Sequence, residues 1–198
     1  MSVPMALVDF IPVILFVITS VTLQRGLYYR MSKGAFAVFS AGTIMVICAG
    51  FFKAVWKLLY GAGICDFARL NQAFFPMQSV GFLLAGIAVI AMVFFKQEPA
   101  GEKLYAAGTP VLFSGTIIFI VAMVLGSLGL CGGLAVEGKR SGRMKSSVFV
   151  ILAFIFMLMM GYLGTKDFSK ASMNWIGEVV NLAGQVFFLI ASRELVRK

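Results

Sequence analysis

A polar stripe crosses an apolar stretch near the C-terminal end of the sequence. Glu178, Asn181 and Gln185 are spaced i, i+3 and i+7, so on a helix they share one face. In a membrane helix, a carboxylate within the hydrocarbon costs at least ~2.5 kcal/mol. The stripe must therefore face the interior of a helix bundle. It is either a ligand site lined by a carboxylate and two amides, or a hydrogen-bond network that locks helix packing.

A second polar stripe lies in the stretch NQAFFPMQSVGF. Asn71 and Gln78 are seven residues apart and share a helix face, with Phe75 between them and Phe82 beyond. Pro76 removes a backbone hydrogen bond, so we expect a helix kink or a local opening near Gln78. Broken helices at membrane depth tend to line cavities, and the alternative is a proline without a role. We predict a ligand pocket in which the amides bind polar groups and the two phenylalanines wall the apolar part.

Charged residues also lie near the ends of the predicted membrane helices. Lys53 and Lys57 are spaced i, i+4 and share a face. We predict an Asp9–Lys53 ion pair, which would lower the insertion cost of both groups. The alternative is that both lysines extend their ammonium groups to the membrane surface. Asp9 and Glu178 are expected near opposite surfaces, so no carboxylate pair is predicted.

The residues of most enzymatic sites are missing. The sequence has no histidine, which argues against His-ligated haem, His-ligated zinc and nucleophiles activated by histidine. No phosphate-binding loop and no hydrolase motif is present. We therefore predict no catalytic residue, no metal site and no cofactor.

The three cysteines offer no redox or zinc motif, because none of them forms a CxxC. Cys48 lies within a predicted helix. Cys65 and Cys131 are both expected near the surface that carries the termini. They would stay reduced if that surface is cytoplasmic and could pair if it is not.

The composition indicates a membrane protein. Hydrophobic residues make up 61% of the chain and charged residues 13%, with a mean hydropathy of +0.98. Soluble domains are about half apolar and about a quarter charged. Crossing a bilayer as a helix takes roughly 20 mostly apolar residues. We predict an all-α fold, a single multi-pass domain of residues 1–198, with six transmembrane helices at residues 5–23, 35–57, 71–95, 109–136, 147–164 and 175–192.

The net charge of +9 comes from basic residues at helix ends and in connections. Such residues anchor a membrane protein to lipid phosphates, so the expected partner is the lipid bilayer and not nucleic acid. Six helices that alternate in direction would place both termini on one side. Lysines and arginines are somewhat more numerous on that side, which favours cytoplasmic termini.

The two halves of the sequence share short motifs at corresponding positions. Each half has "RM" in a basic hairpin before its middle helix, at residues 29–39 and 142–152, and "DF" before its last helix, at 66–67 and 167–168. Three helices per half would invert the second copy, so we predict a 3+3 inverted repeat. The alternative is chance similarity. Inverted repeats are common in transporters, with the binding site between the halves.

Small residues gather in the stretch GSLGLCGG of the fourth predicted helix. Gly129 and Gly133 form a GxxxG pattern, and Gly126 lies three residues before it. Such residues let membrane helices approach closely. We predict that they pack within the bundle, and the alternative is a contact in a homodimer or with a partner membrane subunit.

The functional prediction is a small-molecule transporter or a substrate-binding membrane subunit. Its pocket would lie between the third and sixth predicted helices, with the first contributing. The competing interpretation is a membrane sensor, scaffold or assembly partner, and a lipid-modifying membrane enzyme comes third. A carrier requires a polar-lined cavity beside Gln78 and Glu178. A scaffold requires this space to be filled, with Glu178 paired to a neighbour.

Overall fold

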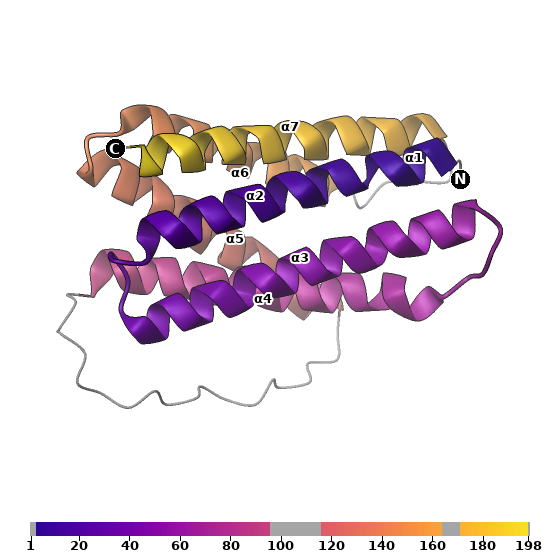
Figure 1. Cartoon of the computed structure of the whole chain (residues 1–198), viewed down its shortest axis with the longest axis horizontal. Coiled ribbons are helices and arrows are strands. Elements are labelled where there is room, and N and C mark those ends of the chain that lie inside the picture. The colour runs from indigo at the N-terminus through magenta and orange to yellow at the C-terminus, as the bar shows by residue number, and fades with distance from the viewer. Residues whose placement is uncertain (1–2, 96–115, 164–170, 198) are drawn as a thin grey trace.

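The computed structural model describes residues 3–95, 116–163 and 171–197, and all structural statements concern these residues (Figure 1). They contain helices and turns and no strand. The helices are α1 (Val3–Val8), α2 (Phe10–Leu27), α3 (Lys33–Gly61), α4 (Ala68–Phe94), α5 (Thr116–Arg140), α6 (Met144–Leu163) and α7 (Ala171–Val196). Together α1 and α2 form one span, so six spans are long and apolar enough to cross a membrane. The predicted all-α membrane fold is confirmed.

Most helices extend beyond the predicted apolar stretches. The predicted bounds followed the apolar runs, whereas a helix continues until a cap ends it. Ser32, for example, accepts a hydrogen bond from the backbone N–H of Ala35 at 3.2 Å and caps α3. Gly142, with a φ of +70°, makes the tight turn between α5 and α6. Residues 109–115 and 164 of the predicted helices lie outside the described residues.

The first span is interrupted at Asp9, between α1 and α2. Pro12 explains the interruption, because it has no N–H to offer the carbonyl of Val8 and its ring crowds that carbonyl. The backbone N–H of Asp9 still bonds the carbonyl of Met5 at 3.2 Å. The chain therefore keeps its direction through the break, and Asp9 stays buried.

The spans form a closed ring (Figure 1). Each packs on two neighbours, in the order α2, α3, α4, α5, α6, α7 and back to α2. Two contacts show that α4 and α5 run parallel. Gly86 lies against Gly126, and further along both helices the Arg140 guanidinium donates to the carbonyl of Val93. Helices α2 and α7 also run parallel, with Gly26 against Val196 at their C-terminal ends.

These directions differ from the expected alternation. The start of α1 and the end of α7 lie at opposite ends of the bundle (Figure 1). We call the first the N-terminal end, where α3 also ends and α7 begins, and the other the basic end, where α3 begins and α7 ends. The expectation that both termini share one side is therefore wrong. Residues 96–115, outside the described residues, connect α4 to α5.

The predicted inverted repeat is not confirmed. The first three spans and the last three spans run in the same sequence of directions, because α5 starts at the same end as α1. Inversion would require α5 to run antiparallel to the first span.

Close helix contact holds α4 and α5 together. A Cβ added to Gly126 would lie 2.4 Å from the backbone of Leu83, and one added to Gly133 would lie 2.6 Å from Val89 Cγ1. A Cβ at Gly129 would lie 2.9 Å from Ile90 Cδ1. The three glycines thus pack within the bundle, and α4 of the same chain occupies the face that a dimer contact would need.

The half of the bundle near the basic end is tied by polar side chains. The hydroxyl of Ser146 donates to the carbonyl of Ala191 at 2.8 Å, and that of Ser147 donates to Ala135 at 2.7 Å. Arg30 and Glu137 form an ion pair at 2.8 Å. The two serine bonds join neighbouring helices, and the ion pair ties the turn between α2 and α3 to α5, so this half is a well-connected core.

Candidate functional site

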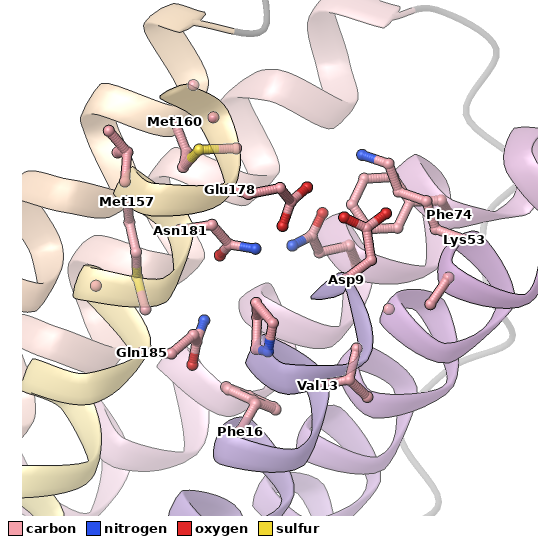
Figure 2. Close-up of a pocket in the computed structure, with 18 of the residues that line it drawn as sticks. Asp9, Val13, Phe16, Lys53, Phe74, Met157, Met160, Glu178, Asn181 and Gln185 are labelled. Carbon is pink, nitrogen blue, oxygen red and sulfur yellow. The ribbon is translucent and has the colours of Figure 1, made fainter. Parts of the chain in front are cut away.

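A cavity of about 1510 Å³ occupies the half of the bundle towards the N-terminal end. All six spans contribute to its walls. Ligand pockets for small molecules typically measure ~300–1,000 Å³, so this one has room for a larger molecule. Figure 2 shows side chains from different spans converging on it.

Aromatic side chains close the cavity towards the basic end. Phe16 packs against Phe82 with ring centroids 6.1 Å apart, and both line the cavity. On its other side Phe16 stacks on Phe188 at 6.3 Å. Met157 and Met160 of α6 form part of the wall (Figure 2). Methionine side chains are flexible, so this wall can adapt to ligands of different shapes.

The charged groups of the cavity centre on Lys57. Its ammonium forms an ion pair with Asp9 Oδ2 and a second with Glu178 Oε1 at 3.2 Å. These three side chains are 9%, 7% and 12% exposed. Two carboxylates from different spans therefore share one buried cation.

The structure corrects the predicted partner of Asp9. Asp9 pairs with Lys57 and not with Lys53, because Lys57 lies one turn further along the same face of α3. The expectation that Asp9 and Glu178 lie near opposite surfaces is also wrong. Since α7 runs parallel to α2, Glu178 comes to the same end of the bundle as Asp9.

Lys53 lines the same cavity but has a different environment. Its ammonium lies over the ring of Phe74, 4.0 Å from the centroid. This cation–π contact offsets part of the cost of removing the charge from water. Among the described residues, Lys53 forms no ion pair.

Several buried oxygen atoms of the site have no hydrogen-bond donor within the described part of the chain. They are Asp9 Oδ1, Glu178 Oε2 and Gln185 Oε1. Each such group costs about 1–3 kcal/mol when it is left unsatisfied. Figure 2 shows the carboxyl groups of Asp9 and Glu178, from neighbouring spans, reaching into the same part of the cavity.

Both predicted polar stripes face this cavity. The residues predicted to bind ligand that line it are Asn71, Phe75, Gln78 and Phe82 of α4 and Glu178, Asn181 and Gln185 of α7. Their role in binding stays a prediction. Helix α4 runs without interruption from Ala68 to Phe94 with Pro76 inside it, so the predicted opening is absent, and the kink stays a prediction.

Sequence reasoning missed the central role of Lys57 and the place of Lys53 in the cavity wall. Their i, i+4 spacing indicated one shared face, but near a helix end this spacing also fits extension to the surface. It also did not include Trp56 and Trp175 in the predicted pocket, although both line the cavity. These two are the only tryptophans of the chain.

The cysteines do not form the pair considered above. Cys65 is exposed in the turn between α3 and α4 at the N-terminal end, whereas Cys131 is buried within α5. Both are free, and so is the half-buried Cys48. Cys131 lies away from Cys65 because α5 runs parallel to α4, in the direction opposite to the predicted one.

No protein-family model, no curated protein and no solved structure matches the chain. The chemistry and geometry of the cavity are therefore the basis for inferring its function.

Proposed function

We propose that the protein is a small-molecule transporter or a substrate-binding membrane subunit, and that its ligand occupies the cavity. The observation that carries this proposal is the cavity itself: about 1510 Å³, lined by all six spans, with charged and amide side chains on its walls. Such a combination of volume, apolar wall and few converging polar groups is typical of ligand sites.

A sensor or scaffold has no need of these features. Each charged side chain at membrane depth costs about 2.5–3.5 kcal/mol on insertion scales. Pairing through Lys57 offsets part of this cost, yet it leaves Lys53 without an ion pair among the described residues. An empty volume also forfeits dispersion contacts that a packed bundle would have. A binding role accounts for both the charge of Lys53 and the empty volume. A packing role accounts only for the ion pairs among Asp9, Lys57 and Glu178, which we call the Lys57 cluster.

The charge distribution supports an orientation in which the basic end faces the cytoplasm. Nine described lysines and arginines lie at the basic end: Arg25, Arg30, Lys33, Lys139, Arg140, Arg143, Lys145, Arg193 and Arg197. Only three lie towards the other end, Lys53, Lys57 and Arg69. The C-terminal end of α7 is then cytoplasmic, and the cavity lies towards the opposite side.

The proposal is tested by thermal unfolding of the detergent-purified protein against a panel of metabolites and amphiphiles. A ligand at about 100 times its Kd stabilises the folded state by about 2.7 kcal/mol. For a chain of this length, that raises the melting temperature by about 5–11 °C.

Two tryptophan substitutions on neighbouring residues provide the matched control. Val13 lines the cavity, so Val13→Trp should fill part of it and reduce the ligand-induced shift. Ile14 is 56% exposed on the outer surface, so Ile14→Trp should retain the shift. If no compound stabilises the wild type, or if both variants respond like the wild type, the cavity is not the binding site and the proposal fails.

A further inference from the structure

Resting on the proposed function, we propose that the cavity binds an amphiphile with an anionic head, and that Lys53 is the residue that binds the head. The ligand class is thus a carboxylate or a phosphate joined to an apolar chain. The inference follows from how the charges of the cavity are shared.

The Lys57 cluster contains more carboxylates than cations. Asp9 and Glu178 each use one oxygen on the Lys57 ammonium. The second oxygens, Asp9 Oδ1 and Glu178 Oε2, are buried and lack a donor among the described residues. Both carboxyl groups reach into the same part of the cavity (Figure 2), so one proton shared between them would give both oxygens a donor. Like charges that share a dry site disfavour double ionisation, which favours such a shared proton.

Lys53 is the cation of the cavity that has no ion pair of its own among the described residues. Its ammonium has the face of Phe74 on one side and forms no ion pair with a described residue. It also lines the cavity. An aromatic face attracts a cation only weakly compared with an anion, and a charge-assisted hydrogen bond to a carboxylate or phosphate oxygen is much stronger. The anionic group of a ligand is therefore the natural partner of Lys53.

The residues that line the cavity around Lys53 and towards the basic end favour an apolar chain. Phe74 of α4 lies against Lys53 and Phe75 of α4 also lines the cavity, while Phe16 and Phe82 close it towards the basic end. Ile120 of α5 and Leu158 of α6 also line the cavity, so apolar lining is contributed by these helices as well.

The two native tryptophans allow a direct test. Trp56 and Trp175 both line the cavity and are the only tryptophans of the protein. A probe with a brominated alkyl chain that binds in the cavity therefore quenches the tryptophan fluorescence. The full-length protein in neutral maltoside micelles is titrated with probes that share one brominated octadecyl chain. The probes are the fatty acid, the lysophosphatidate, the lysophosphatidylcholine, the monoacylglycerol and the primary amine. A brominated maltoside sets the background of unspecific quenching.

We expect saturable quenching by the fatty acid or the lysophosphatidate at concentrations at least about tenfold lower than for the neutral, zwitterionic and cationic probes. Whichever of the two anionic probes binds with the higher affinity identifies the preferred head as carboxylate or phosphate. Lys53→Met should remove most of this preference, and Lys53→Arg should keep it. Lys145→Met, at an exposed position of the basic end outside the cavity lining, should leave the relative affinities of the probes unchanged.

Other outcomes overturn the inference in distinguishable ways. Equal saturable quenching by all heads, or preference for the amine, retains the cavity as a binding site but refutes the anionic head. An unchanged preference in Lys53→Met refutes the role of Lys53. Displacement by acetate or inorganic phosphate at the same concentrations as the chain-bearing anions refutes the need for a chain. Quenching no greater than that by brominated maltoside refutes the proposed function itself.

Discussion

Removal of the Lys57 ammonium should destabilise the protein strongly. Lys57→Met leaves Asp9 and Glu178, both nearly buried, without the cation that holds them together. Breaking a buried ion pair by removing one partner typically costs about 3–5 kcal/mol, because the remaining charge stays uncompensated. At about 2–4 °C per kcal/mol for a chain of this size, the melting temperature should fall by about 6–20 °C.

The same substitution one turn earlier is the control. Lys53→Met removes an identical group from the same face of α3, but it leaves no described carboxylate without its partner. It loses a cation–π contact worth about 0.5–2 kcal/mol, and it no longer has a charge to insert into the membrane. We therefore expect a change of at most a few degrees in either direction.

A double-mutant cycle measures the ion pair itself. Glu178→Gln removes one of the two carboxylates, so Lys57→Met should cost less in that background than in the wild type. We expect a coupling energy of about 1–3 kcal/mol, from the difference between the double variant and the sum of the single variants. Melting curves of the four proteins in one detergent provide the data. Additive effects, or equal losses in Lys57→Met and Lys53→Met, would refute the assignment of Lys57 as the shared partner.

Three further predictions test orientation, packing and protonation. A membrane-impermeant maleimide added to intact cells should label exposed Cys65 at the N-terminal end but not Met144→Cys at the basic end, and the reverse pattern contradicts the proposed orientation. Gly126→Ala should destabilise the protein by about 1–3 kcal/mol, since its Cβ would lie 2.4 Å from the backbone of α4. Gly132→Ala, with nothing within 4 Å, should not destabilise the protein, and equal melting temperatures of the two variants would refute the close contact. Infrared difference spectra should contain a C=O band of a protonated carboxyl group that Glu178→Gln lacks, and its absence from the wild type argues against the shared proton.

The membrane spans could be predicted because continuous apolar runs of about 20 residues have few other uses. The ends of the spans could not be predicted closely from hydropathy alone. Lys33 and Arg140 belong to helices, although their charges mark the limit of the apolar run. A helix ends where its backbone is capped, as at Ser32, and a charged residue at the membrane surface does not stop it.

Part of the cavity lining could also be predicted. The stripe from Glu178 to Gln185 faces the interior because polar groups avoid lipid, and helical periodicity assigns them to one face. The stripe on α4 follows by the same reasoning. Periodicity states which residues share a face, however, and says nothing about which helix ends meet. That depends on the direction of α5, which alternation of the spans predicted wrongly.

The charged cluster illustrates why this gap matters for function. Taken separately, Asp9, Lys57 and Glu178 each lie close enough to a helix end to reach the surface, and isolated charges near a membrane boundary usually do so. Once α7 runs parallel to α2, the three groups meet, and mutual pairing replaces the need for water. Lys53 then differs from Lys57 by a single helical turn, yet one lysine is neutralised within the bundle and the other faces the cavity beside Phe74. The proposed binding of an anionic head rests on this difference between the two lysines.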